Sequence, residues 1–272
     1  MGQAQMRQCA AVWPHLCHIR RGLTPRQTPT RTAPALLAGA MAEKHHLYLV
    51  DGSSYIFRAY HRLPPLTNPQ GTPVGAVYGY TTMLWKLAAD LDAADGPTHL
   101  AVILDASGVS FRNEIYDLYK ANRPEPPEDL VPQFPLIRDA TRAFSLPCIE
   151  VEGLEADDLI ASYARRAQER GWDVTIVSSD KDLMQLIGEQ NGANGPARID
   201  MLDTMKNQRI WLEEVEEKFG VGPDLVGDVL ALMGDSVDNV PGIFGIGPKT
   251  ASKLIAEHGS LTAALDAAPA MK

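Results

Sequence analysis

Three short apolar runs in this chain each lead into an aspartate. The runs are residues 47–50, 100–104 and 174–177, and the aspartates after them are Asp51, Asp105 and Asp180. Continuous apolar runs bounded by polar residues are typical of parallel strands that are covered on both faces. Right-handed crossovers bring the carboxyl ends of such strands to one edge, where ligands bind. The sequence therefore predicts an α/β fold in which these aspartates lie together.

A fourth segment adds three carboxylates to the same edge. Glu155, Asp157 and Asp158 follow Gly153 and open a helix that is predicted by apolar residues at 3–4 spacing. Acids in a first turn suit the helix dipole, and this alone would explain one or two of them. A metal site is the other interpretation, and the aspartates that follow the strands favour it.

So many carboxylates at one edge require counterions. Their mutual repulsion would raise some of their pKa values, and hard divalent cations resolve the conflict. Ligation by oxygen alone favours magnesium or manganese over zinc. Two such ions about 3.5–4 Å apart are the usual apparatus for attack on a phosphodiester. Asp182, two residues after Asp180, belongs to this predicted site.

Composition sets limits on the class of protein. A length of 272 residues allows a substantial core and two domains. The net charge of −9 is unusual for a nucleic-acid binder, but a carboxylate-rich metal site contributes to it and is neutralised when loaded. Three sparse cysteines indicate a reducing compartment, and no apolar run is long enough to span a bilayer.

Residues 1–41 form a separate basic leader, which we predict to be disordered. Residues 1–40 contain arginines but no Asp or Glu, and Thr and Pro dominate residues 23–34. A transit peptide and a basic nucleic-acid arm are the functional interpretations. We favour a start at Met41, which would make the leader an artefact of start-site choice. Its Cys and His residues fit no common zinc-finger spacing.

The segment after Asp105 carries bases and aromatics. Residues 111–123 read as a helix whose basic and aromatic residues share one face. Such a stripe suits single-stranded nucleic acid, with charge for the backbone and rings for stacking, although a solvated face is the simpler interpretation. The neighbouring metal site makes us favour the first. Its residues are Arg112, Tyr116, Tyr119, Lys120 and Arg123.

The remaining elements are predicted from periodicity and breakers. We expect helices over residues 55–60, 74–91 and 130–144, with Trp85 in the core. A short strand is expected over residues 147–151 and a turn-rich loop over 188–195, with residues 199–202 and 209–211 pairing around it. Arg58, on the first helix, is either a surface ion-pair partner or a phosphate contact.

After Trp211 the chain reads as short helices around a glycine loop. Residues 245–247 precede Pro248, which is tolerated at a first helical position, so backbone amides face outward at a helix start and can bind a phosphate. A Walker A loop is excluded because Pro248 separates the glycines from Lys249 and no strand precedes the loop. A plain helical hairpin is the other interpretation, and the nearby Asp235 and Asp238 weigh against it.

Five motifs in order resemble the 5′–3′ exonuclease of bacterial DNA polymerase I, a family similar to the flap endonucleases. They are VDGSS at residues 50–54, EADD at 155–158, SDKD at 179–182, MGDSVDN at 233–239 and GIGPKTA at 245–251. The resemblance covers about residue 44 to the end. It implies a PIN-like domain with a mostly parallel sheet over residues 42–209. A helix-three-turn-helix (SAM-like) DNA-binding module that holds potassium would follow over residues 210–272.

The resemblance also implies roles for individual residues. Metal ligands would be Asp51, Asp105, Glu155, Asp157, Asp158, Asp180, Asp182 and Asp238, with Asp235 close by. Catalysis would rest on Asp51, Asp105 and Asp157 together with Arg58, Lys120 and Arg123. DNA contacts would come from Arg58, Arg112, Tyr116, Tyr119, Lys120, Arg123, Gly245, Gly247, Lys249 and Thr250. The family usually has Glu where Pro248 stands, which we expect to matter little.

The predicted function is a structure-selective 5′ nuclease that removes 5′ flaps and RNA primers from DNA in replication and repair. It would use two magnesium ions, with manganese as a substitute, and act as a cytoplasmic, nucleoid-associated monomer. A PIN-type ribonuclease would explain the first domain but not the glycine loop at residues 245–247. A non-catalytic DNA-binding module would leave the carboxylates unexplained.

Overall fold

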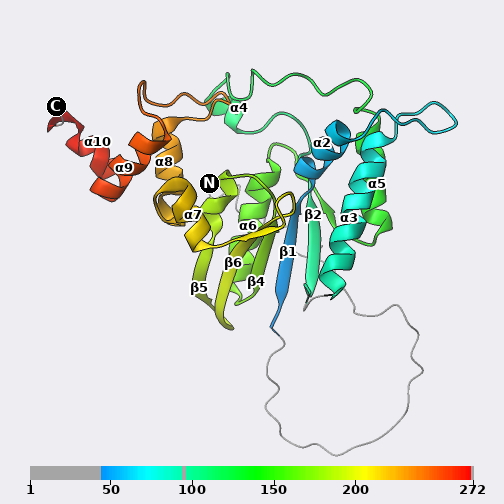
Figure 1. Ribbon diagram of the computed structural model, residues 1–272, viewed down its shortest axis with the longest axis horizontal. Helices are drawn as coiled ribbons and strands as arrows, with labels where there is room; N and C mark the ends of the chain where they lie inside the picture. The colour runs from blue at the N-terminus through cyan, green and yellow to red at the C-terminus, as the bar shows by residue number, and fades with distance from the viewer. Residues whose placement is uncertain (1–43, 94–95, 271–272) are drawn as a thin grey trace, which may run out of the picture.

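The computed structural model describes residues 44–93 and 96–270 (Figure 1). The predicted disorder of residues 1–41 therefore lies outside the described residues. Within them, the strands form one sheet in the order β3-β2-β1-β4-β6-β5, and β7 pairs with β6. The strands are β1 (His46–Asp51), β2 (His99–Ile103), β3 (Cys148–Ile149), β4 (Asp173–Val177), β5 (Gly188–Gly192), β6 (Gly195–Asp203) and β7 (Gln208–Ile210).

The three apolar runs are the central strands, as predicted. β1 lies between β2 and β4 and pairs with both in parallel, and β4 pairs in parallel with β6. Val50 lies opposite Val102 in β2 and Val177 in β4, so the three strands end at nearly the same level. The aspartates that follow them consequently leave the sheet at one edge, which is the upper edge in Figure 1.

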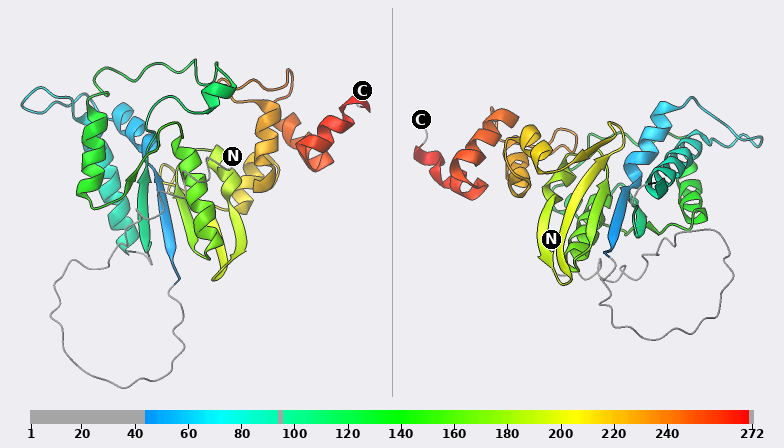
Figure 2. Two further views of the ribbon diagram at one scale, coloured as in Figure 1. Left: turned by 180° about the vertical axis from the view of Figure 1, so that it is seen from behind. Right: turned by 60° about the horizontal axis from the view of Figure 1, so that its bottom comes forward.

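Helices cover both faces of the sheet. One face packs against α2 (Gly52–Arg62), α3 (Gly75–Ala93) and α5 (Gln133–Ala143), in a core that contains Tyr48, Tyr80 and Ile137. The other face packs against α6 (Ala156–Glu169), which lies in front of the sheet in the view from behind in Figure 2. This coverage explains why the central strands are apolar on both sides.

The C-terminal helices continue the second core. They are α7 (Leu212–Phe219), α8 (Val226–Met233), α9 (Pro248–His258) and α10 (Leu261–Ala267), with short 3-10 turns η3 (Pro223–Leu225) and η4 (Ala268–Ala270). Val215, Val229 and Ile255 are buried in the same cluster as Leu159 of α6 and Ile199 of β6. The helical module therefore packs firmly beside the sheet. The division we predicted between residues 209 and 210 stays a prediction.

The predicted helix over residues 111–123 is wrong. The structure has one short turn, α4 (Arg112–Ile115), followed by irregular turns. Tyr116 is extended, and Lys120 has a positive φ of 55°, which a helix does not allow. The Asn113 side chain donates to the carbonyl of Tyr119 instead, at 3.1 Å, so local side-chain bonds replace the helical ladder.

Two smaller predictions also fail. The expected loop over residues 188–195 is β5, the start of β6 and the tight turn that joins them, because Asn and Gly residues make the turn rather than an open loop. Trp85 was expected in the core but is 66% exposed. The buried apolar side chains of α3 are Ala76, Tyr80, Leu84, Leu87 and Leu91, and their spacing places Trp85 on the solvent-facing side of the helix.

Candidate active site

Four aspartates at the carboxyl edge of the sheet interact with one another. Asp51 ends β1 and caps α2, accepting from the amide of Ser54 at 2.9 Å and from the hydroxyl of Ser178 at 2.7 Å. Asp105, just after β2, accepts from the amide of Ala156 at 2.7 Å, which ties the β2 edge to the start of α6. Asp157 follows in the first turn of α6, and Asp180 follows β4.

The electrostatics of this quartet show how crowded it is. Burial raises the pKa of Asp51 to about 6 against the effect of its hydrogen bonds, and the charges of Asp105 and Asp180 add to the rise. Burial also raises the pKa of Asp157 well above its usual value, with Asp51, Asp180 and Asp105 adding repulsion. The charged forms of Asp51 and Asp157 are therefore disfavoured, and a bound cation would stabilise them.

A second group of acids lies around Lys181. The Nζ atom of Lys181 donates to Asp182 at 3.1 Å and to Asp235 at 2.6 Å. Burial and the nearby charge of Asp180 raise the pKa of Asp182. The pKa of Asp235 is lowered, because the bond from Lys181 and backbone amides outweigh its burial. Lys181 thus bridges the end of β4 and the loop after α8.

A third group joins Glu155 to Asp238 through the arch segment, by which we mean residues 110–131 between β2 and α5. The Tyr119 hydroxyl lies 3.0 Å from Glu155 and 3.1 Å from Asp238. Lys120 Nζ lies 2.9 Å from Glu155 and 3.8 Å from Asp238, and Arg123 also pairs with Asp238. The arch segment crosses above the carboxyl edge of the sheet (Figure 1).

Asp158 is bound differently from the other acids. Both its oxygens accept from the Arg112 guanidinium, and it accepts from the amide of Glu155 at 3.1 Å. Glu155 and Asp158 form a capping box at the start of α6, so the helix-start interpretation holds for these two residues.

The remaining predicted DNA contacts lie outside these groups. Arg58 donates to the hydroxyl of Thr204 at 3.1 Å and lies over the Tyr55 ring, so its observed partners are uncharged. Tyr116 is partly buried in the arch segment. Gly247 caps α9, Pro248 takes its first position, and Lys249 and Thr250 are exposed.

Sequence reasoning missed three supporting residues. Ser178 holds Asp51, and the Ser110 hydroxyl donates to Glu155 at 2.8 Å. Lys181 lies between two of the predicted ligands in the SDKD motif, and that alternation of charges was the signal for it. The serines had no such signal, because their partners come from other elements.

The donor set suits hard divalent cations because every candidate ligand is a carboxylate oxygen. Although these aspartates act on one another's charge, no three His, Cys, Asp or Glu side chains within residues 44–93 and 96–270 are already arranged to hold one metal ion. Basic side chains hold several of the acids instead, namely Arg112, Lys120, Arg123 and Lys181. The raised pKa values of Asp51 and Asp157 indicate where further positive charge is needed.

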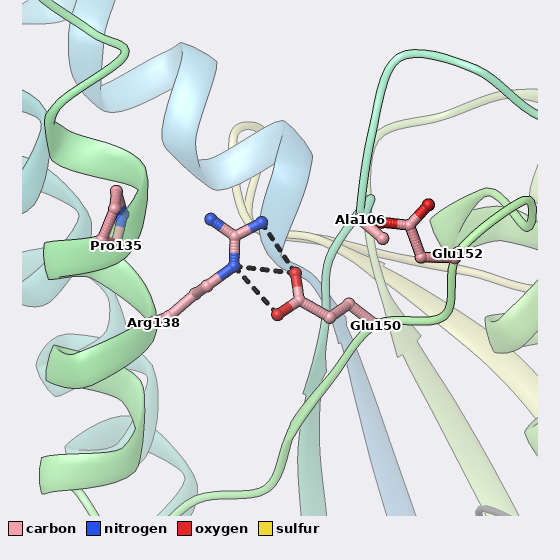
Figure 3. A pocket seen from close by; sticks show the side chains of 5 residues that line it. All are labelled: Ala106, Pro135, Arg138, Glu150 and Glu152. Atoms are coloured by element: carbon pink, nitrogen blue, oxygen red, sulfur yellow. Dashed lines mark hydrogen bonds and ion pairs between the residues drawn. The ribbon is translucent and has the colours of Figure 1, made fainter.

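A shallow hollow beside this edge takes no part in the acid groups. It is lined by Ala106, Pro135, Arg138, Glu150 and Glu152 (Figure 3). Arg138 of α5 donates to both oxygens of Glu150, at 2.9 and 2.7 Å, so its charge is already matched. In the part of the chain that the structure describes, no helix is both long and apolar enough to cross a membrane.

A PIN-like α/β sheet with an acidic carboxyl edge and a helical module beside it defines a class of nucleases, and comparison with known proteins agrees. The family model "5′-3′ exonuclease, N-terminal resolvase-like domain" matches residues 46–220. The model "5′-3′ exonuclease, C-terminal SAM fold" matches residues 221–272. The chain belongs to the 5′–3′ exonuclease family.

Individual relatives support this assignment. The chain is 54% identical to a DNA polymerase I of Rhizobium leguminosarum over 91% of its own length and 24% of that protein. It is 40% identical to a 5′-3′ exonuclease of Aquifex aeolicus over 79% of its length and 70% of that protein. The chain thus spans about a quarter of the polymerase I relatives.

Solved structures share the fold. The T5 5′-exonuclease with bound zinc ions matches with a TM-score of 0.64 and 25% identity, over 82% of this chain and 79% of the other. The bacteriophage T5 flap endonuclease, in a complex with DNA and metal ions, matches with the same TM-score at 23% identity, over 82% of this chain and 78% of the other. The predicted fold class, a PIN-like domain followed by a SAM-like helical module, is confirmed.

Proposed function

We propose that this chain is a structure-selective 5′ nuclease that hydrolyses DNA phosphodiesters, with 5′ flaps and RNA primers on DNA as substrates in replication and repair. The observation that carries the proposal is the gathering of Asp51, Asp105, Asp157 and Asp180 at one edge, where burial and the neighbouring carboxylates raise the pKa of Asp51 and Asp157. Family membership and the helical module beside that edge support a DNA substrate.

The carboxylates would hold two divalent ions, magnesium in the first place and manganese as a substitute. When bound, such ions supply an activated water and neutralise the leaving oxygen. Asp51 and Asp105 are fixed for this task by bonds from Ser178 and from the Ala156 amide, so they are oriented in advance. The ligand set is Asp51, Asp105, Glu155, Asp157, Asp158, Asp180, Asp182, Asp235 and Asp238.

The arch segment positions the reacting phosphate. Lys120 and Arg123 lie against Glu155 and Asp238, so their charges are already beside the acids that would surround the scissile bond. Tyr119 is held between the same two acids. Arg58 and Tyr116 would add further contacts to the DNA. When a phosphate of the DNA enters this site, Lys120 and Arg123 would release their carboxylate partners and bind the phosphate oxygens instead.

The helical module holds the duplex. The exposed loop of Gly245 and Gly247 before α9 offers backbone amides to a phosphate, and Lys249 and Thr250 lie beside it. A potassium ion bound in this loop would neutralise the DNA phosphate next to the one held by the amides. The chain acts as a monomer, because one copy contains both the acidic edge and the duplex-binding loop.

One assay tests the proposal against its alternatives. A flap duplex with a 5′ label and a plain RNA strand are each incubated with the protein and magnesium, and the products are sized. Release of the flap with the RNA intact supports the proposal. Cleavage of the RNA alone would favour a PIN-type ribonuclease, and binding without cleavage would favour a DNA-binding module.

A further inference from the structure

Phe244 is the most exposed large apolar side chain among the described residues. Its exposed fraction is 103%, which means that the rest of the protein covers none of it. Gly245 follows it with a φ of +80°, a backbone conformation that residues other than glycine rarely adopt. The tight turn at this glycine leaves the Phe244 ring projecting into the solvent. The same loop exposes Val240 and Ile243, at 38% and 45%. Such a surface is costly in water unless a ligand covers it.

The charge around Phe244 is unusual for this chain. From residue 239 to residue 256 there is no Asp or Glu, although the net charge of the protein is −9. Lys249 and Lys253 of α9 are exposed in this stretch, so their charges face the solvent. The loop therefore combines an apolar tip with a locally positive flank. An anionic partner with apolar surface matches both features.

We propose that Phe244 is a non-ionic anchor that packs into the minor groove of duplex DNA, against the apolar edges of the deoxyriboses. The inference rests on the proposed function and adds a contact of a different chemical kind to it. A phosphate at the amides before α9 would place the neighbouring sugars within reach of the loop tip. Apolar side chains commonly enter the minor groove, where sugar and base edges are accessible.

A duplex explains this surface better than a single strand does. Stacking on unpaired bases uses an aromatic ring within a basic groove that follows the strand. Here the Phe244 ring is fully exposed at the tip of its loop, and the exposed side chains of Val240 and Ile243 on that loop are apolar. The aromatic and basic residues that suit a single strand, Tyr119 and Lys120, lie in the arch segment instead.

The test measures duplex affinity as a function of salt, without divalent ions so that no strand is cut. Phe244→Ala should weaken binding about 10-fold at every salt concentration, with the salt slope unchanged, because burial of an apolar ring releases no counterions. Lys249→Ala should reduce the slope by about one. Phe244→Leu should recover part of the loss. Leu265→Ala, which alters a 52% exposed leucine of α10, is the matched control and should bind like the wild type.

Two further probes locate the contact. Filling the minor groove of the duplex with a groove-binding drug should abolish the difference between wild type and Phe244→Ala. A single-stranded oligonucleotide should show no such difference. The inference is overturned if Phe244→Ala binds duplex normally, if its salt slope falls as that of Lys249→Ala does, or if the loss is larger on the single strand. Failure of the wild type to cleave a flap would instead refute the proposed function.

Discussion

Arg112 and Asp158 form a two-pronged ion pair between the arch segment and α6. Nη1 and Nη2 of the arginine lie 2.7 and 2.8 Å from the two carboxylate oxygens. The carboxylate side chain is only 5% exposed and that of the arginine is 33% exposed. The hydrogen bonds that Arg112 donates to Asp158 raise the pKa of the guanidinium against the effect of burial. Such a pair fixes where the arch segment leaves the sheet.

The first prediction is that this pair supports the fold. Asp158→Ala should lower the free energy of unfolding by about 2 kcal/mol, because it leaves a half-buried arginine without its partner. In the double variant the effects of Arg112→Ala and Asp158→Ala should add only in part, with a coupling energy of about 1 kcal/mol between them. Urea unfolding of the two single variants and the double variant measures this. Fully additive effects would mean that the two residues act independently.

A second prediction concerns Asp157, which would be a metal ligand. Asp157→Ala should slow flap cleavage by roughly 10²-fold or more, if several kcal/mol of charge stabilisation is lost. Binding of the flap should survive, since the duplex contacts lie elsewhere. Single-turnover cleavage and a binding assay separate the two quantities. Asp139→Ala removes a 76% exposed aspartate of α5 and serves as the control. Cleavage at the wild-type rate by the Asp157 variant would refute the site.

The sequence predicted the sheet and its acidic edge because both depend on local pattern. Apolar runs that end in Asp51 and Asp105 specify buried parallel strands, and topology then brings their ends together. The start of α6 could be predicted in the same way, since Glu155 and Asp158 form a capping box that accepts hydrogen bonds from backbone amides of its first turn. Each of these features is encoded within a few neighbouring residues.

What the sequence did not reveal depends on contacts between distant segments. The basic and aromatic residues of the arch segment have the spacing of a helix, yet the segment forms turns that are held by the loop after α8. The amide of Lys120 donates to the carbonyl of Asp238 at 2.9 Å, and Asn239 donates to the carbonyl of Leu118 at 2.7 Å. Partners more than a hundred residues away leave no periodic signal. The pairing of Arg112 with Asp158 was hidden in the same way, because 46 residues separate the two side chains.

The third prediction separates the arch segment from the duplex clamp. Lys120→Ala and Arg123→Ala should slow single-turnover cleavage at saturating protein, because they would act at the reacting phosphate. Lys249→Ala should instead weaken duplex binding and reduce its salt slope by about one. Arg166→Ala removes an exposed arginine of α6 and is the control for loss of charge. If all three variants lost affinity alone, and equally, the two roles would be wrong.

The fourth prediction follows from the crowded aspartates. Burial raises the pKa of Asp51 from 3.8 to about 6, and the pKa of Asp157 is also raised. Between the two pKa values of Asp51 the folded state binds more protons than the unfolded state, so the free energy of unfolding falls as the pH rises. The contribution of protonated Asp51 to stability is therefore complete below about pH 4 and is lost as the pH rises through 6. For Asp51 alone, the shift corresponds to roughly 3 kcal/mol. Thermal melting without divalent ions should accordingly show falling stability between pH 4 and 7.

Magnesium should reverse that loss, because it binds the folded arrangement and adds stability in a saturable way. It should raise the melting temperature at pH 7 by more than potassium does at equal ionic strength. Asp157→Asn removes one charge with little change of shape. The variant should therefore melt higher than the wild type without magnesium, respond less to magnesium and lose less stability with rising pH. Equal magnesium shifts in both proteins, or a variant that melts lower without metal, would mean that these carboxylates do not crowd around shared ions.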